Sequence, residues 1–198
     1  ITLVPVGPLT NIALAIRQAP EILEKIPEIV IMGGGHHVSN CTSSAEFNIW
    51  VDPEAARVVI NSGRPIRLIT LDATHEALFT MKTCAALREA GTPAATCSAA
   101  FAEVRIKAYD ESQPMASLGA APIHDALAVC AIMQPDVVST VYAHVDVETA
   151  GELTDGRTVV DIDRTGDRGR RPPNVDVALH ADGEAFREMM LRILAKTI

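Results

Sequence analysis

The sequence lacks the features that mark several classes of protein. None of its four cysteines forms a Cys-x-x-Cys pair or has a histidine at zinc-finger spacing, so neither a structural zinc site nor a disulfide framework is expected. No apolar run approaches the ~20 residues of a membrane span, and no basic-then-apolar leader opens the chain. We therefore expect reduced thiols, a cytoplasmic location and no membrane partner.

Positive charge is also scarce. The 198 residues include 17 Lys and Arg against 25 Asp and Glu, which gives a net charge of −8. A nucleic-acid surface needs clustered basic residues to neutralise phosphates. The one basic cluster, residues 164–171, is interrupted by Asp167 and glycines and leads into Pro172, a pattern typical of an exposed loop. A small polar ligand or a cation is the expected partner, and nucleic acid is not.

The remaining composition is that of an ordinary globular protein. Hydrophobic residues make up 48% of the chain and charged residues 21%, close to the averages for soluble domains. The length suits one domain with its own core. The chain begins with Ile1, and residues 1–5 have the pattern of a buried strand, so we expect the sequence to start inside a domain.

Three short apolar runs alternate with helical patterns, which predicts parallel strands joined by helices. Thr10 is placed to cap the first of these helices, and Asp52 followed by Pro53 predicts the start of the second. The fold class is therefore α/β, a mainly parallel, open Rossmann-like sheet with flanking helices, in a single domain over residues 1–198. The expected parallel strands are 1–6, 28–32 and 66–71. The alternating segments 141–148 and 157–162 are expected to form an antiparallel pair joined by residues 151–156, and the later helices are 82–91, 99–110, 124–133 and 182–196.

Ligands of open α/β sheets bind beyond the carboxyl ends of the strands, which directs attention to the loop after residue 32. Its three glycines, 33–35, do not form a dinucleotide-binding motif, because Val38 stands where that motif needs glycine. Further along, Glu46 and Asn48 are two residues apart, so in an extended loop they point the same way. Such a pair can grip the vicinal hydroxyls of a sugar. Tying down a turn explains the pair equally well.

A second candidate is the His124-Asp125 pair at the start of a predicted helix. Asp125 could bind a hard cation through its oxygens, and His124 could donate a proton near neutral pH. The alternative is that both residues only cap the helix, which is the commoner role of polar residues at this position.

Five segments then occur in an order seen in one enzyme family. They are Leu-Val-Pro-Val-Gly-Pro-Leu-Thr-Asn-Ile-Ala (3–13), Ile-Met-Gly-Gly-Gly (31–35), Ala-Glu-Phe-Asn-Ile-Trp-Val-Asp-Pro-Glu-Ala-Ala (45–56), Leu-Asp-Ala-Thr-His (71–75) and Ile-His-Asp-Ala-Leu-Ala-Val (123–129). Together they resemble the inosine–uridine-preferring nucleoside hydrolases, calcium-dependent enzymes that cut the bond between ribose and base. The resemblance covers nearly the whole chain and is weakest over residues 92–119.

The resemblance implies a calcium ion that orients the attacking water. It assigns metal binding to Asp125 and to the backbone carbonyl of Val6. It also places His124 beside the leaving base as a candidate general acid. Tyr109 could stack on the base, as aromatic side chains do, although packing on a helix face explains it equally well.

The same resemblance implies that the ribose is bound by Asn40, Glu46 and Asn48. Asn40 is carried over both as a substrate-binding residue and, with His124, as a candidate catalytic residue. The ligand expected from this set is a ribonucleoside, and the expected assembly is a homo-oligomer, because members of the family are dimers or tetramers.

One part of the family pattern is absent. The family opens with an Asp-x-Asp-x-x-x-Asp-Asp motif after its first strand, and nothing like it occurs in this sequence. We therefore expect the first strands of the family fold to be missing. Three readings stay open: a nucleoside hydrolase when complete, a non-catalytic nucleoside- or ribose-binding homologue that cannot complete the metal site, and a structural subunit that assembles through an exposed sheet edge.

Overall fold

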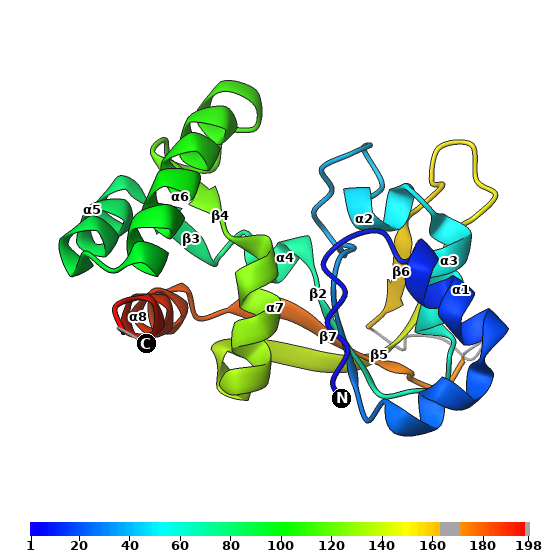
Figure 1. The fold of residues 1–198 in the computed structure, drawn as a ribbon. Helices are drawn as coiled ribbons and strands as arrows, with labels where there is room; N and C mark the ends of the chain where they lie inside the picture. The colour runs from blue at the N-terminus through cyan, green and yellow to red at the C-terminus, as the bar shows by residue number, and fades with distance from the viewer. Residues whose placement is uncertain (163–170, 197–198) are drawn as a thin grey trace. The chain divides into compact units, whose positions relative to one another are not determined.

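The computed structural model describes residues 1–162 and 171–196, which divide into two compact units. The first unit contains Ile1–Ala73 and Val138–His180, and the second contains Thr74–Val137 and Ala181–Ile198. Figure 1 shows the elements of both, and each is described by itself. The single domain expected over 1–198 stays a prediction. The predicted basic loop lies outside the described residues except for Arg171, which is exposed.

The first unit is built on a five-stranded sheet of order β1-β2-β7-β5-β6, with a parallel part formed by β1, β2 and β7. In this part Met32 pairs with Ile69, and Ile69 pairs with Ala178, so the three strands reach the same edge. The other two strands, β5 and β6, form an antiparallel pair. The bounds are β1 Ile29–Met32, β2 Ile66–Ile69, β5 Val138–Val147, β6 Thr158–Asp161 and β7 Val175–Ala181.

Strand β1 is buried on both faces, which explains its composition. All four residues of β1, Ile-Val-Ile-Met, are buried, as expected for a strand covered on both sides. Helix α1 packs against α3, and α3 packs against β5 (Figure 1). The helices of this unit are α1 Thr10–Gln18, the 3₁₀ helix η1 Pro20–Lys25, α2 Phe47–Trp50, α3 Pro53–Ile60 and α4 Leu71–Thr74, whose last residue belongs to the second unit.

Two local expectations in this unit are wrong in detail. Residues 1–6 do not form a full strand: only Leu3 makes a bridge, to Ile29 of β1, although Pro5 accepts a hydrogen bond from the backbone of Met32. Thr10 is the first residue of α1 and not its cap, since its hydroxyl donates to Asp52 Oδ2 instead. Asp52 does cap α3 as predicted, by accepting from the Ala55 N–H at 3.0 Å.

The second unit is mainly helical. Its two short strands pair antiparallel, and Phe79 of β3 packs against Phe186 of α8 with ring centroids 5.8 Å apart. Asp182 caps α8 by accepting from two backbone N–H groups. The elements are β3 Leu78–Thr80, α5 Met81–Ala90, α6 Pro93–Ser112, β4 Ala120–Pro122, α7 His124–Met133, the 3₁₀ helix η2 Pro135–Val137 and α8 Gly183–Leu194.

The predicted fold class is confirmed, as a mixed α/β structure with a mainly parallel central sheet and flanking helices. The predicted antiparallel pair corresponds to β5 and β6, and the helix expected over 124–133 is α7. Strand β7 was not predicted. In the part of the chain that the structure describes, no helix is both long and apolar enough to cross a bilayer.

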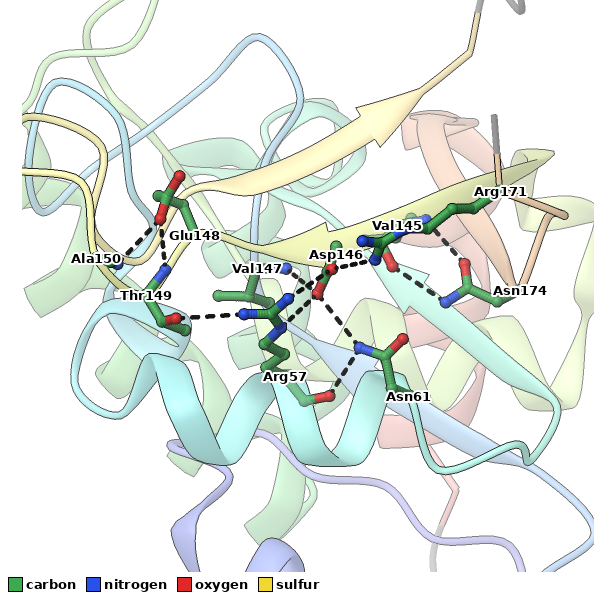
Figure 2. Close-up of polar contacts among 10 residues, drawn as sticks. All are labelled: Arg57, Asn61, Val145, Asp146, Val147, Glu148, Thr149, Ala150, Arg171 and Asn174. Carbon is green, nitrogen blue, oxygen red and sulfur yellow. Dashed lines mark hydrogen bonds and ion pairs between the residues drawn. The ribbon is translucent and has the colours of Figure 1, made fainter. Parts of the chain in front are cut away.

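Asp146 joins β5 to helix α3 on the first unit (Figure 2). Its Oδ1 lies 3.0 Å from Arg57 Nε, and its Oδ2 lies 2.9 Å from Arg171 Nη1. Asn61 Nδ2 and the backbone N–H of Val147 also donate to Oδ1. Burial tends to raise the pKa of Asp146, but the Val147 N–H and Arg57 outweigh it, and the pKa is lowered.

We expect Asp146→Asn to lower the free energy of unfolding by about 1 kcal/mol, because the amide would leave two guanidinium groups without their anion and ion pairs as exposed as these contribute up to about this much. Urea unfolding followed by circular dichroism measures the loss. The control is Asp155→Asn, at an exposed carboxylate with no side-chain partner among the described residues. Equal stability of the two variants would contradict the prediction.

Candidate active site

The loop after β1 lies at the edge where the parallel strands end, and its glycines allow a tight path. Gly34 has φ +67°, and a Cβ there would lie 2.6 Å from Thr158 Cγ2. A Cβ on Gly35 would lie 1.9 Å from the carbonyl oxygen of Val38. Neither position accepts a side chain without a shift of its neighbours. The glycines therefore let the loop fold against β6 and against itself.

Glu46 is buried beneath this loop, with 4% of its surface exposed. Its Oε2 accepts from the Gly34 N–H at 2.9 Å and from the Ile49 N–H at 3.3 Å. The second bond makes Glu46 the N-cap of α2. The expectation of an extended segment here is wrong, because Asn48 lies inside this helix. The carboxylate joins the glycine loop to the start of α2.

Two asparagines flank Glu46 in the sequence. Asn40 lies in the loop before it, and Asn48 lies in helix α2 after it. Asn48 is 9% exposed, and its Nδ2 donates to the Met32 carbonyl at 3.0 Å, at the end of β1. Asn40 is exposed, and its Oδ1 accepts from the Phe47 N–H at 3.0 Å. The structure thus brings together the three residues predicted to bind ribose. All three take part in holding the loop, so the structural reading of the Glu46–Asn48 pair is confirmed, and the binding of ribose stays a prediction.

Val6, the predicted carbonyl ligand, follows directly after the residue that pairs with Met32. Because the segment runs parallel to β1, Val6 lies at the same carboxyl edge as the glycine loop. The residue is exposed, and its carbonyl oxygen accepts no hydrogen bond among the described residues. That oxygen is therefore free to bind a cation or a water molecule.

Asp72 holds the other end of the glycine loop. Its carboxylate accepts from the backbone N–H groups of His36 and His37 at 2.7 and 2.9 Å, and His37 Nδ1 lies 3.1 Å from Oδ1. Burial tends to raise the pKa of Asp72, but these hydrogen bonds outweigh it, so the pKa lies below its ordinary value of 3.8. The charged form is the one that fits the loop.

In the second unit His124 is the first residue of α7, and both of its ring nitrogens have a partner. Nε2 lies 2.9 Å from the hydroxyl of Tyr109 on α6, and Nδ1 lies 2.7 Å from the hydroxyl of Thr74. Burial, His75 and Arg105 together lower the pKa of His124 to about 3. The ring is therefore neutral in this arrangement at physiological pH.

Asp125, the next residue, is exposed and opens onto a cavity of about 580 Å³ in the second unit. Burial of part of the carboxyl raises its pKa, which Arg105 partly offsets. No hydrogen bond to this side chain is seen among the described residues. The cavity wall is mostly apolar and includes Phe79, Phe101, Pro122 and Met190, and its polar members include Ser98, Arg105, His124 and Asp125.

The described residues do not contain a complete metal site. No group of three or more His, Cys, Asp and Glu side chains within 1–162 and 171–196 is arranged to hold an ion. The two predicted ligands, the Val6 carbonyl and the Asp125 carboxylate, are oxygen donors of the kind that calcium prefers, but calcium takes six to eight oxygens. The donors fit calcium in kind and supply only part of the number.

Comparison with known proteins gives the family. A sequence model described as "Inosine-uridine preferring nucleoside hydrolase" matches residues 1–188. The chain belongs to this family. The inosine-uridine preferring nucleoside hydrolase of Crithidia fasciculata is 40% identical over 198 residues, 99% of this chain and 60% of that protein. The pyrimidine-specific ribonucleoside hydrolase RihB of Escherichia coli O157:H7 is 41% identical, over 94% of this chain and 58% of that protein.

Solved structures of the family agree. A purine-preferring ribonucleoside hydrolase from Gardnerella vaginalis superposes with a TM-score of 0.85 at 36% identity, over 97% of this chain and 59% of that one. A plant nucleoside hydrolase gives a TM-score of 0.90 at 26% identity, over 100% of this chain and 62% of that one. The chain thus spans about 60% of the length of each of these four relatives.

Several residues that hold the candidate site in place could not be assigned a role from the sequence. Asp72 and Thr74 stand in the quoted segment 71–75, so a signal for them existed without an assigned role. Thr158 carries no such signal. Its hydroxyl accepts from the Gly35 N–H at 3.0 Å and donates to the Gly35 carbonyl at 2.6 Å, across 123 positions of sequence. The two residues come together only when β6 pairs within the folded sheet, so the sequence alone could not predict this contact.

Asp72→Asn should lower the free energy of unfolding by about 1–3 kcal/mol at pH 7, since the anion accepts backbone hydrogen bonds that an amide matches poorly. The folded pKa is depressed, so the stabilisation is fully present above 3.8 and is lost as the pH falls through the folded pKa. Urea unfolding at several pH values from 7 to 3 should show the two proteins converging below about pH 4. A constant difference down to pH 3 would contradict the assignment.

Proposed function

We propose that this chain carries part of the active site of a ribonucleoside hydrolase, which splits the N-glycosidic bond to give free base and ribose. The observation that carries the proposal is the family match over residues 1–188, a range that contains all the site residues predicted from the sequence. Among the named relatives, RihB is a pyrimidine-specific ribonucleoside hydrolase and the Gardnerella vaginalis enzyme is a purine-preferring one. The cytoplasmic location and the homo-oligomer stay predictions.

Glu46, Asn48 and Asn40 are proposed to bind the ribose. Cleavage of a glycosidic bond passes through a state with positive charge on the sugar ring. A carboxylate fixed in advance stabilises that charge without a cost of reorganisation, and Glu46 is fixed by the N–H groups of Gly34 and Ile49. The carboxamides of the two asparagines can donate to and accept from sugar hydroxyls.

His124 and Tyr109 are proposed to face the leaving base. The bond breaks more easily when the departing nitrogen receives a proton or a hydrogen bond, and the two side chains are already bonded to each other at 2.9 Å. The apolar wall of the adjoining cavity, which includes Phe79 and Phe101, suits the flat face of a nucleobase.

Calcium is proposed as the cofactor, with the Val6 carbonyl and the Asp125 carboxylate among its ligands. When bound, calcium supplies a template and a mild Lewis acid for the attacking water. The Asp125 carboxylate has no hydrogen-bond partner among the described residues, which leaves its oxygens available to a cation. Two ligands supply only part of the six to eight oxygens that calcium takes.

The alternative is a nucleoside- or ribose-binding protein without hydrolysis. It is favoured by one observation, that the described residues contain no group of three metal-binding side chains. This protein would keep Asn40, Glu46 and Asn48 and would bind ribonucleosides without releasing base. Calorimetry with inosine combined with an assay of free base separates the two functions.

Glu46→Gln should lower kcat/KM for release of base from inosine and uridine by about 10²–10³-fold, as removal of one preorganised electrostatic group does in other enzymes. Steady-state kinetics measure the effect, and circular dichroism checks that the fold is kept. The matched control is Glu54→Gln, an exposed carboxylate on α3 outside the proposed site. Unchanged kinetics in Glu46→Gln would remove this residue from the mechanism.

Asp125→Ala should weaken calcium binding by about a hundredfold, because calcium affinity varies by orders of magnitude with the charge and number of ligands. Isothermal titration with calcium alone measures it. The control is Asp110→Ala, whose carboxylate accepts from the Gly119 N–H on another part of the second unit. If both variants bind calcium as tightly as the unmodified protein, Asp125 is not a ligand.

A further inference from the structure

The glycine loop after β1 is held by a side chain that the proposed mechanism does not use. Thr158 is the first residue of β6 and is 3% exposed. Its Oγ1 accepts from the Gly35 N–H at 3.0 Å and donates to the Gly35 carbonyl at 2.6 Å. Among the described residues no other group bonds to this N–H or this carbonyl. One hydroxyl therefore satisfies both polar backbone groups of Gly35.

The methyl group of Thr158 restrains the preceding residue. Gly34 has φ +67°, and a Cβ there would lie 2.6 Å from Thr158 Cγ2. Threonine thus presents a hydroxyl to Gly35 and a methyl group to Gly34. Serine lacks the methyl group and valine lacks the hydroxyl, so substitution by each of them separates the two contacts.

Gly34 connects Thr158 to the proposed ribose site. Its N–H donates to Glu46 Oε2 at 2.9 Å, and its carbonyl accepts from the Leu71 N–H at 2.9 Å. The direction of the Gly34 N–H depends on the backbone angles of the loop, and glycines by themselves have a wide choice of these angles. The two hydrogen bonds to Gly35 narrow that choice. Their loss frees the Gly34 N–H to turn away from the carboxylate.

We propose that Thr158 is a positioning residue for Glu46, which acts through Gly34 and Gly35 and touches no ligand. Its hydroxyl fixes Gly35, so that the Gly34 N–H points at Oε2 and holds the carboxylate in one place. A carboxylate stabilises positive charge on a sugar ring best when it is held in position before the reaction. The hydroxyl of Thr158 supplies part of that hold from the neighbouring strand.

The consequence for catalysis rests on the proposed function, in which Glu46 faces the ribose. Thr158→Val keeps the shape of the side chain and removes the hydroxyl. It should lower kcat/KM for release of base from inosine by about 10–100-fold, because a misplacement of about 1 Å can cost about a hundredfold in rate. Thr158→Ser keeps the hydroxyl and should stay close to the unmodified protein. A serine variant as impaired as the valine variant would contradict the role of the hydroxyl.

A double-mutant cycle separates positioning of the carboxylate from general damage. Thr158→Val is introduced into the unmodified protein and into Glu46→Gln. If Thr158 acts through the carboxylate, its hydroxyl has little left to position once that charge is gone, and the second loss should be about twofold or less. Equal fold-losses of kcat/KM in the two backgrounds would overturn the proposal.

Hydrogen exchange tests the same contact without any activity. The Gly34 N–H is compared with the N–H of Val30, which donates to the Leu3 carbonyl in β1. A general loss of stability speeds exchange at both positions, whereas local release of the loop speeds exchange at Gly34. In Thr158→Val the exchange rate of Gly34 should rise by about tenfold relative to that of Val30. An unchanged ratio would overturn the proposal.

The matched control is Thr92→Val in the second unit. Thr92 is 8% exposed, and its Oγ1 also accepts from one backbone N–H, that of Ala95 at 3.1 Å, and donates to one carbonyl, that of Leu194 at 2.5 Å. This control should leave both kcat/KM and the exchange ratio unchanged. Equal changes in Thr92→Val and Thr158→Val would assign the effect to lost stability and overturn the proposal.

Two further outcomes are distinguished. If Thr158→Val does not fold, Thr158→Cys takes its place, since a thiol is only a weak donor and acceptor, and it should show the same changes to a smaller extent. Absence of turnover in the unmodified protein would refute the proposed function. The exchange ratio would then still decide whether the hydroxyl of Thr158 holds the Gly34 N–H on Glu46.

Discussion

A buried carboxylate sets the shape of the candidate ribose site. Oε2 of Glu46 accepts hydrogen bonds from the N–H groups of Gly34 and Ile49, and it thereby joins the end of β1 to the start of α2. Burying a carboxylate without such donors would cost several kcal/mol, so the glycine loop and the helix together supply the hydrogen bonds that this side chain needs. The same carboxylate is the group proposed to face the ribose. Its functional placement and its structural duty therefore cannot be separated.

The helices and strands with strong local signals were predictable. Asp52 followed by Pro53 marks the start of α3, and the alternating pattern before and after 151–156 marks the antiparallel strands β5 and β6. Features that depend on contacts between distant parts of the chain were not predictable. Thr10 has the chemistry of a helix cap, yet Asp52 lies close enough to take its hydroxyl, and Leu9 holds the cap position instead. Strand β7 was missed, although it lies between β2 and β5 in the sheet.

The same distinction between local and distant signals holds for the candidate site. Glu46, Asn48, His124 and Asp125 could be chosen from motifs, because each motif is continuous in sequence. Their partners could not, because the contact between His124 and Thr74 spans 50 positions and that between Gly35 and Thr158 spans 123. Spacing also misjudged the local backbone around Glu46 and Asn48, since it gives their separation and not whether the segment is extended or helical.

The bond between Thr158 and Gly35 also bears on how the protein folds. Closing a loop of more than a hundred residues has an entropic cost before any contact offsets it, and contacts of such separation slow folding. The glycine loop can reach its final path only after β6 has docked beside it. The glycine loop should thus be among the last regions to take shape during folding, and an incompletely folded chain would have its helices before it had the candidate site.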